Sequence, residues 1–363
     1  MRIAQIAPLS ERVPPPAYGG TEIIVSLLTD ELVHRGHEVT LFASGDSQTL
    51  ARLKPSCPKA LRAIEASPAE ISVYQTLQLN QVFTQAAQFD LIHSHVGEPV
   101  FPYSNLATTP TLHTVHGIIP SQVEPLWRAS RHQNFISISN SQRRKDLQLN
   151  YVATVYNGID TSRYPFYPQP NNPPYLAFLG RMSPEKGPHL AIEIAKRTGW
   201  HLKMAGKIDP VDREFFKEQI QPQIDGEQIE FLGEANHQQK CPLLGGAVAT
   251  LFPITWNEPF GLVMAESMAV GTPVIAIAMG STPEVIEDSK TGFLAHSVDE
   301  CIAALDRIGS IDRATCRDRV ITKFGVERMV DDYEAVYQQL LAKQPLINQP
   351  ITNLMVNKNR LTA

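Results

Sequence analysis

The sequence predicts an α/β fold made of two parallel-sheet domains that face each other across a cleft. Three observations support this prediction. The chain has 363 residues, a length that suggests two domains. In both halves, short apolar strand patterns alternate with helical patterns, which is typical of βαβ units. Between the halves, residues 162–175 are rich in proline and asparagine and lack helical periodicity, so we interpret them as a linker.

The first half opens with a βαβ unit. Residues 2–8 (RIAQIAP) have the pattern of a buried strand, and residues 37–45 (HEVTLFASG) that of the next one. The amphipathic segment between them predicts a helix with Thr21 as its cap and Gly36 as its end. We assign this domain to residues 1–165. Its further strands are expected at residues 90–95, 110–116, 134–139 and 153–158.

The alternation restarts after the linker and predicts a second domain over residues 172–324. A long helix is expected at residues 325–343, and the weakly patterned residues 344–363 are expected to form a loose tail. The second domain is expected to contain strands at 175–180, 201–206, 229–234, 249–254, 272–278 and 292–295, and helices at 188–199 and around 261–271.

Composition excludes several classes of protein. The chain is 43% hydrophobic and 19% charged, with a formal net charge of -5, so no strong field attracts nucleic acid or an anionic membrane. The basic cluster at residues 143–145 is short. We interpret it as a solvated helix end, with contact to an anionic acceptor or lipid as the alternative.

Cysteines and the N-terminus indicate the compartment. The four cysteines are scattered without a Cys-x-x-Cys pair, which excludes the usual zinc-ribbon and redox motifs and fits reduced thiols in the cytosol. The sequence MRIAQIAPL enters a strand directly and lacks a signal-peptide pattern. No apolar run reaches the ~20 residues of a membrane-spanning helix. We therefore expect a cytoplasmic protein.

The segment PPPAYGGTE (residues 14–22) joins the first strand to the first helix. Gly19 and Gly20 would let the backbone approach a ligand closely, and the helix N-terminus after them offers free N–H groups suited to a phosphate. The segment has neither the Gly-x-Gly-x-x-Gly spacing of dinucleotide-binding loops nor a Walker A lysine. A plain tight turn is the alternative.

The segment LGRMSPEKG (residues 179–187) carries two cations around a predicted helix start. Ser183 and Pro184 suit the cap and the first turn. Cations are disfavoured by the dipole at that end of a helix, so Arg181 and Lys186 indicate an anion bound between them, such as a diphosphate. The alternative is that Glu185 neutralises them in solvent.

The segment NEPFGLVMAE (residues 257–266) places two glutamates in apolar surroundings. Pro259 suits a helix start, so the amides of residues 260–262 would face phosphate or sugar oxygens. Glu258 can accept hydrogen bonds from sugar hydroxyls. Glu266 lies inside an apolar helix and needs a partner, which we expect to be a pair of ribose hydroxyls. The alternative is that Glu258 only caps the helix and Glu266 pairs with a nearby Arg or Lys.

The histidines are the remaining candidates for chemistry. A metal site among His93, His95, His113 and His116 is conceivable, but no carboxylate or cysteine completes a ligand spacing, and the chain contains no Asp-x-Asp. We therefore expect no bound metal and structural roles for His93 and His113. His116 precedes a glycine at a strand end, faces the expected cleft, and is the best functional candidate of the four.

These motifs together resemble glycosyltransferase family 4, whose members are retaining enzymes with two facing Rossmann-like domains, the GT-B fold. The resemblance extends from the N-terminus to about residue 343. Glu-x-x-Phe-Gly-x-x-x-x-Glu combined with Arg-(x)4-Lys is its most specific part. The other parts are YGGTE, DLIHSH, HTVHG, NGID, and the GTPVIA, GSTPEVI and TGFL segments.

The resemblance implies a role for each candidate residue. The last helix would cross back onto the first domain, the nucleotide would sit on the second domain and the acceptor on the first, and no metal would be needed. Gly20, together with Gly19, would lie near the donor diphosphate or the acceptor. Arg181 and Lys186 would hold the diphosphate, His116 and Glu258 would contact the transferred sugar, the amides of Phe260, Gly261 and Leu262 would contact sugar and phosphate, and Glu266 would bind the ribose.

The expected function is that of a retaining hexosyltransferase that uses a nucleotide-diphosphate sugar. UDP-glucose is our first choice of donor, and the acceptor is open: a small molecule, a lipid-linked sugar or a growing polysaccharide. Two rivals stay open. A sugar-nucleotide epimerase of the same architecture would need no acceptor. A nucleotide-dependent dehydrogenase or binding module is disfavoured because the first βα turn lacks the glycine spacing.

Overall fold

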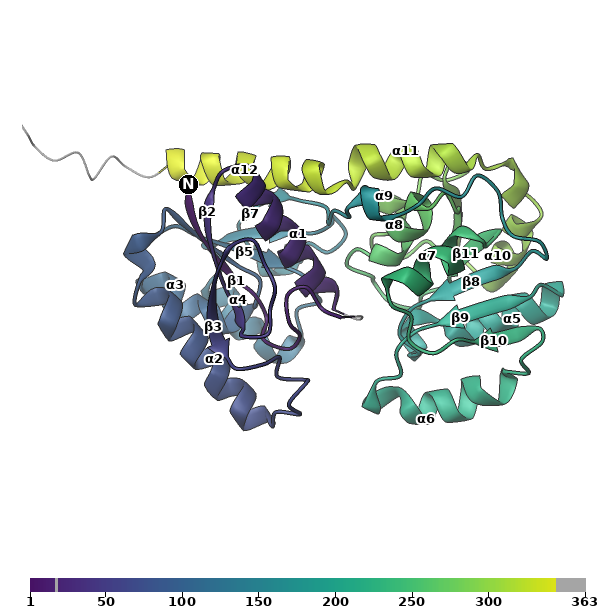
Figure 1. Ribbon diagram of the computed structural model, residues 1–363, viewed down its shortest axis with the longest axis horizontal. Coiled ribbons are helices and arrows are strands. Elements are labelled where there is room, and N and C mark those ends of the chain that lie inside the picture. The colour runs from purple at the N-terminus through teal and green to yellow at the C-terminus, as the bar shows by residue number, and fades with distance from the viewer. Residues whose placement is uncertain (17–18, 344–363) are drawn as a thin grey trace, which may run out of the picture.

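The computed structural model describes residues 1–16 and 19–343, and its strands form two parallel β-sheets set side by side (Figure 1). The first sheet has the strand order β3-β2-β1-β4-β5-β6-β7 and the second the order β10-β9-β8-β11-β12-β13. Within each sheet the strand order reverses next to the first strand, as in doubly wound nucleotide-binding folds. The predicted fold class is confirmed. The predicted tail, residues 344–363, lies outside the described residues.

Both sheets are built from short, mostly buried strands. The strands of the first sheet are β1 (Arg2–Ile6), β2 (Glu38–Ser44), β3 (Arg52–Cys57), β4 (Leu91–Ser94), β5 (Thr111–Val115), β6 (Asn134–Ser137) and β7 (Tyr151–Thr154). The strands of the second sheet are β8 (Leu176–Leu179), β9 (Leu202–Ala205), β10 (Ile229–Phe231), β11 (Ala249–Phe252), β12 (Val274–Ile277) and β13 (Gly292–Ala295).

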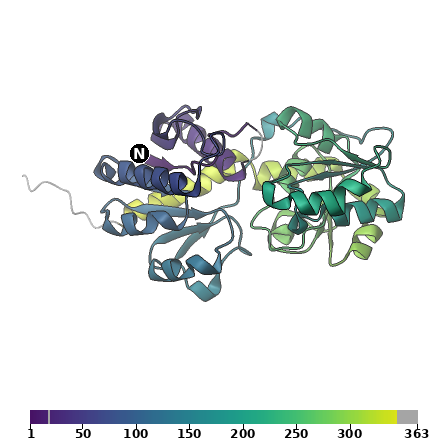
Figure 2. The ribbon, with the colours of Figure 1, turned by 90° about the horizontal axis from the view of Figure 1, so that it is seen from below.

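Helices cover both faces of the sheets (Figures 1 and 2). Those in the first half of the chain are α1 (Gly20–His34), α2 (Pro68–Phe83), α3 (Phe101–Leu106) and α4 (Glu124–Ala129). Those in the second half are α5 (Pro188–Thr198), α6 (Arg213–Phe215, continued by a π-helical turn at Phe216–Ile220), α7 (His237–Gly245), α8 (Leu262–Ala269), α9 (Thr282–Val285), α10 (Val298–Leu305), α11 (Arg313–Lys323) and α12 (Val326–Ala342).

Three details of the first half of the chain differ from the sequence prediction. Helix α1 begins at Gly20 with Gly19 as its cap, so Thr21 lies inside the first turn and is not the cap. Strand β3, at the edge of the sheet, was not predicted, because its sequence RLKPSC contains a lysine and a proline and lacks alternation. Strand β7 also lies earlier than expected, at Tyr151–Thr154.

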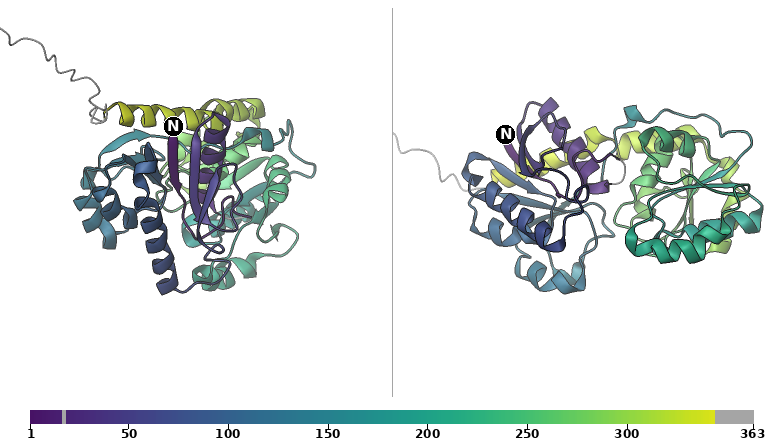
Figure 3. Two further views of the ribbon diagram at one scale, coloured as in Figure 1. Left: turned by 60° about the vertical axis from the view of Figure 1, so that its left-hand side comes forward. Right: turned by 60° about the horizontal axis from the view of Figure 1, so that its bottom comes forward.

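Helix α12 returns the chain from the second sheet to the first (Figures 1 and 3). Its buried face, which includes Met329, Val330 and Tyr333, shares a hydrophobic core with strand β1 and helix α1. The return passes beside the outgoing chain, where Ile159 and Val326 are joined by a backbone hydrogen bond of 3.0 Å. Gly158 is needed there because a Cβ atom would lie 2.9 Å from the carbonyl oxygen of Gly325.

The proline-rich segment between the sheets is fastened to the second one. Tyr164 and Tyr175 belong to the core of the second half, and Tyr167 donates a backbone hydrogen bond of 2.9 Å to the Val270 carbonyl. Arg313 of α11 is buried and donates to the Tyr167 carbonyl at 2.7 Å. The linker therefore forms part of the surface of the second half.

Two further observations concern the described residues. All four cysteines are buried free thiols. Within residues 1–16 and 19–343, no helix is both long enough and apolar enough to cross a membrane.

Candidate active site

A pocket of about 360 Å³ lies between the two sheets, beyond the carboxyl ends of β5, β8 and β11. Ligands of open α/β sheets bind at this edge. The pocket walls include all ten residues singled out from the sequence: Gly19, Gly20, His116, Arg181, Lys186, Glu258, Phe260, Gly261, Leu262 and Glu266. The fold thus gathers into one cavity motifs that are spread over almost 250 positions of the chain.

Lys186 and Glu258 form an ion pair on the wall of the pocket. Lys186 Nζ lies 2.5 Å from Glu258 Oε2, and the two side chains are 18% and 9% exposed. Trp256 supports both: its Nε1 donates to Glu258 Oε2 at 3.0 Å, and its ring lies 4.8 Å from Lys186 Nζ. The carboxylate is therefore partly committed to the protein and still borders the cavity.

Arg181 sits among carboxylates. Its guanidinium pairs with Glu185, lies 3.5 Å from Asp209 and 3.4 Å from Asp212. Lys207 lies 3.0 Å from Asp209 and also borders the pocket. The alternative that Glu185 neutralises its basic neighbours is thus realised for Arg181 in this structure, but the pair is half-buried and Arg181 lines the cavity.

The turn that carries Lys186 is shorter than predicted. Ser183 and Pro184 start only a single 3-10 turn, Pro184–Lys186, and the Ser183 side chain makes no capping hydrogen bond. Helix α5 begins at Pro188, after Gly187 in the left-handed conformation (φ 73°). A helical turn thus begins at Pro184, but it is a single 3-10 turn without a side-chain cap, and the helix expected at residues 188–199 begins at Pro188 as predicted.

Helix α8 also begins later than predicted. It starts at Leu262, with Gly261 as its cap at φ 77°, so Pro259 is not at the helix start. Residue 261 must be glycine because a Cβ atom would lie 2.7 Å from Met264 Cε and would need a left-handed backbone. No side chain caps α8, so the alternative role of Glu258 as a helix cap is wrong.

Glu266 lies within the first turns of α8 and is only 5% exposed. It has protein partners: Lys240 forms an ion pair with its Oε1, and Tyr164 donates to the same oxygen at 2.9 Å. Burial, followed by the charge of Glu266, raises the pKa of Tyr164, so this tyrosine stays a hydrogen-bond donor. The alternative of pairing with a lysine therefore holds in this structure, and ribose is not required to explain the burial of Glu266.

The first domain contributes the opposite wall. Gly20, at the N-terminus of α1, faces the start of α8: a Cβ atom on it would lie 3.7 Å from Leu262 Cδ1. His116 follows β5 and borders the same pocket. The N-termini of α1 and α8 thus approach each other across the cavity.

A chain of buried hydrogen bonds leads from His116 into the core. His116 Nε2 lies 2.8 Å from His95 Nδ1, and His95 Nε2 lies 2.9 Å from Gln5 Oε1. Gln5 donates to Tyr337 of α12 at 3.4 Å. Because Gln5 Oε1 accepts from His95 Nε2–H, neutral His95 accepts at Nδ1 from His116 Nε2–H. This order leaves Nδ1 of His116 as a hydrogen-bond acceptor.

The same chain continues through His93. Tyr337 Oη lies 2.7 Å from His93 Nδ1, and His93 Nε2 lies 2.8 Å from Thr114 Oγ1. Thr114 in turn lies 3.1 Å from Tyr333 Oη. Two tyrosines of the returning helix therefore take part in positioning the histidines behind the pocket.

All four clustered histidines are held neutral by burial. Burial lowers the pKa of His93 and His95 well below the usual range and lowers the pKa of His113 and His116 to about 3. His113 packs edge-on against Phe101, with ring centroids 5.1 Å apart. In the described part of the chain, no group of three or more His, Cys, Asp or Glu side chains is placed to hold a metal ion.

Sequence reasoning missed several residues of the site. Lys240 and Tyr164 contact Glu266 but come from separate segments of the chain, so no local spacing in the sequence indicates them. Trp256 is the exception, because an indole two positions before a buried glutamate was a usable signal. Asp209, which lies two positions after Lys207 and pairs with it, was also not predicted.

Two facing parallel-sheet α/β domains with a pocket between them that basic side chains line form the GT-B architecture. Family comparisons agree: the model for glycosyl transferases group 1 matches residues 164–314, and the model for glycosyltransferase family 4 matches residues 18–163. The chain belongs to glycosyltransferase family 4.

Known proteins similar to this chain are distant ones. Glycogen synthase of Mycobacterium tuberculosis is 24% identical, with 99% of each chain covered. Sucrose-phosphate synthase from Thermosynechococcus elongatus has a similar structure (TM-score 0.76, 20% identity, 95% of this chain and 100% of that one). Anabaena HepE in complex with UDP-glucose is also similar (TM-score 0.69, 16% identity, 93% and 100% covered).

Proposed function

We propose that the protein is a metal-independent, retaining hexosyltransferase that moves a sugar from a nucleotide diphosphate, UDP-glucose in our first choice, to an acceptor hydroxyl. One observation carries the proposal: the pocket combines basic side chains, a free helix start and two buried carboxylates. This is the set of groups that a diphosphate, a hexose and a ribose need. The UDP-glucose complex of HepE, a solved structure with a similar fold, supports the choice of donor.

Donor binding exchanges ion-pair partners. In this structure Arg181 and Lys186 pair with Glu185 and Glu258. A diphosphate between them offers oxygens that suit the planar fork of arginine and the point charge of lysine. The amides at the start of α8, from Phe260 to Leu262, add donors and the positive end of the helix dipole.

The two glutamates then bind hydroxyls. When Lys186 turns to the diphosphate, Glu258 accepts hydrogen bonds from the hexose and keeps Trp256 as its other donor. Glu266 shares its charge between Lys240, Tyr164 and the ribose hydroxyls. His116, with Nε2–H committed to His95, accepts a bond from a hydroxyl of the transferred sugar at Nδ1.

The chemical step follows from where negative charge develops. The bond between the anomeric carbon and the β-phosphate oxygen breaks, and its electron pair stays on that oxygen. The acceptor oxygen forms the new bond to the anomeric carbon from the same face, and its proton passes to the leaving phosphate. Arg181, Lys186 and the α8 amides stabilise this charge, an effect that is typically worth roughly 100- to 1000-fold in rate for each donor.

A donor assay tests the proposal. Purified protein is incubated with UDP-, GDP- and ADP-sugars without added metal and in the presence of EDTA, and nucleotide release and sugar transfer are followed. Arg181→Ala and Lys186→Ala should each lower transfer by roughly 100-fold or more. Lys196→Ala, an exposed cation of the same domain, is the matched control and should leave transfer unchanged.

The outcomes separate the rival functions. Near-normal turnover in both pocket variants would refute the assigned roles of the cations. Appearance of an isomerised sugar nucleotide without acceptor would favour an epimerase, and loss of transfer in EDTA that added Mg²⁺ restores would refute the metal-independent mechanism.

A further inference from the structure

A second pocket, of about 190 Å³, adjoins the donor pocket on the side of the first domain. The two pockets share His116 and Gly117 as lining residues. The smaller one is otherwise bounded by the turn after β4, where Gly97 and Glu98 lie, and by Trp127 of α4. A molecule seated there would meet the reacting end of the donor beside His116.

The two pockets differ sharply in charge. Basic side chains from the second domain line the donor pocket: Arg181, Lys186, Lys207 and Lys240. Among the described residues that line the smaller pocket, none is Lys or Arg, and Glu98 is the one charged side chain. Its two histidines, His95 and His116, have pKa values lowered by burial and stay neutral at physiological pH.

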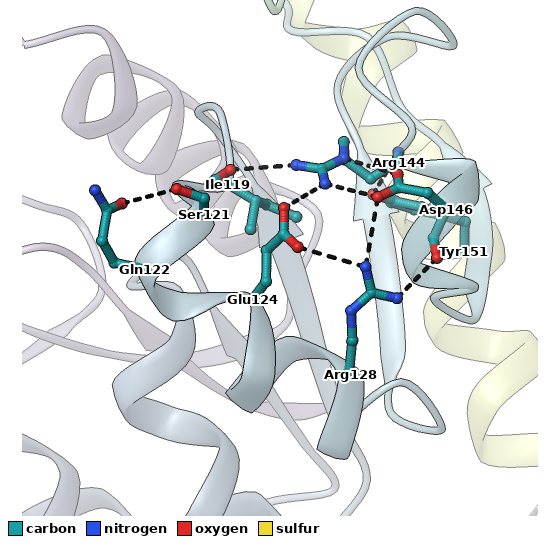
Figure 4. A network of polar contacts seen from close by, with 8 residues as sticks. All are labelled: Ile119, Ser121, Gln122, Glu124, Arg128, Arg144, Asp146 and Tyr151. Atoms are coloured by element: carbon teal, nitrogen blue, oxygen red, sulfur yellow. Dashed lines mark hydrogen bonds and ion pairs between the residues drawn. The ribbon is translucent and has the colours of Figure 1, made fainter.

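The nearby basic cluster does not alter this balance. Arg144, next to the turn that closes the smaller pocket, pairs with Glu124 at 2.5 Å and with Asp146 at 2.7 Å, and donates to the Ile119 carbonyl (Figure 4). Arg128 contacts the same two carboxylates. These arginines brace the turn, so the alternative role of residues 143–145 as an anion contact finds no support in Arg144.

The smaller pocket instead offers groups that suit hydroxyls. Glu98 can accept hydrogen bonds from hydroxyls, and Ile118, which is 52% exposed, adds an apolar surface at the rim. The volume lies below the roughly 300–1,000 Å³ of typical small-molecule sites, which fits one ring-sized group.

We propose that the smaller pocket binds the acceptor, and that the acceptor group there is a neutral sugar or polyol without a phosphate or carboxylate. The inference rests on the proposed transferase function and names the substrate class of its second site. A phosphate monoester would bring about -1.5 to -2 charges beside Glu98, and none of the described residues that line this pocket is a Lys or Arg that could pair with it. Like charges facing each other across a binding site suppress the wrong partner.

Matched acceptor pairs test the inference. Glucose, fructose and myo-inositol are compared with glucose 6-phosphate, fructose 6-phosphate and myo-inositol 3-phosphate at equal concentration, with the donor identified in the assay above. Donor consumption and product mass are measured in every reaction. Neutral members should be used with a kcat/KM about tenfold or more above that of their phosphorylated partners, as expected for one unfavourable charge contact.

Variants of Glu98 test whether this residue causes the preference for neutral acceptors. Glu98→Lys should shift the ratio of neutral to phosphorylated turnover towards the phosphorylated member by about tenfold or more, and Glu98→Gln should shift it less. Glu218→Lys, an exposed charge reversal on the second domain, should leave the ratio unchanged. Thermal unfolding of each variant checks that the fold is intact.

The possible outcomes distinguish a failure of the acceptor inference from a failure of the proposed function. Preference for a phosphorylated acceptor, or a ratio that Glu98→Lys does not move, would overturn the inference while the donor chemistry stands. Consumption of donor by water alone, with neither member of any pair glycosylated, would also overturn it for this pocket. If no donor is consumed in any reaction, the proposed function itself fails, and the acceptor inference falls with it.

Discussion

Replacing Lys186 by methionine removes one half of the ion pair that faces the donor pocket. The two charges lie 2.5 Å apart, and at an effective dielectric constant of 20 they attract each other by about 6–7 kcal/mol before desolvation is counted. Desolvation of the two ions offsets most of this, so we expect a net coupling of about 1–3 kcal/mol. Lys186→Met also leaves Glu258, 7% exposed, with Trp256 as its remaining side-chain donor.

The variant should therefore be less stable by about 2–3 kcal/mol, because an unpaired buried carboxylate is costly. For a domain of this size each kcal/mol lowers the unfolding midpoint by about 2–4 °C, so the expected shift is about 4–12 °C. The double variant Lys186→Met/Glu258→Gln should recover most of it, since the stranded charge is gone. Thermal unfolding at pH 7 and low salt measures the cycle, with Lys196→Met as control.

Activity separates stability from catalysis in the same cycle. Transfer should fall by roughly 100- to 1000-fold in Lys186→Met and stay low in the double variant, because restored stability does not restore the cation. An unfolding midpoint that is unchanged by Lys186→Met, or lowered further in the double variant, would refute the coupling. Recovery of transfer in the double variant would refute the catalytic role of the lysine.

Three further perturbations test other parts of the site. Glu266→Gln should raise the donor KM by about tenfold, since a charged hydrogen bond is worth about 1.5–3 kcal/mol, and calorimetry should show a similar loss of affinity for UDP. Lys240→Met should lower the UDP affinity less. An unchanged UDP affinity in Glu266→Gln would contradict the ribose contact. Tyr337→Phe should lower kcat by about 2- to 10-fold at constant donor KM, because it removes the hydrogen bonds of the Tyr337 hydroxyl with His93 and Gln5, which lie behind His116. An unchanged kcat would show that α12 does not position the histidines. His113 and His116 have pKa values of about 3 in the folded protein, below the ~6.5 of an unfolded histidine. Their contribution to the free energy of unfolding is therefore complete above about pH 6.5 and is lost as the pH falls towards 3, by about 1.4 kcal/mol per pH unit for each histidine. Unfolding midpoints that stay constant from pH 6.5 to 4 would contradict this.

Most elements of the fold could be predicted because their strands are short, apolar and regularly spaced. Strand β3 could not, because an edge strand tolerates Lys54 and Pro55, which break the pattern. The start of α8 was placed too early for a related reason. Pro259 suits the first turn of a helix, but the left-handed backbone of Gly261 prevents the helix from starting before Leu262. The sequence alone does not indicate which of these two residues sets the start of the helix.

The site was predictable in its chemistry and not in its internal pairing. Arg181, Lys186, Glu258 and Glu266 stand out because charged groups sit where local structure disfavours them. The residues that contact the site from elsewhere in the chain could not be predicted. Lys240 contacts Glu266, and Tyr337 contacts His93, only because the fold brings distant segments together. The same contacts explain why a buried glutamate is tolerated before any donor is bound.

A structure of the protein with a bound UDP-sugar tests the central claim most directly. We expect the diphosphate to lie between Arg181, Lys186 and the amides at the start of α8. The Lys186–Glu258 ion pair should be broken, and a ribose hydroxyl should donate a hydrogen bond to Glu266. A nucleotide bound elsewhere, or a Glu266 that still contacts only Lys240 and Tyr164 with the nucleotide in place, would contradict it.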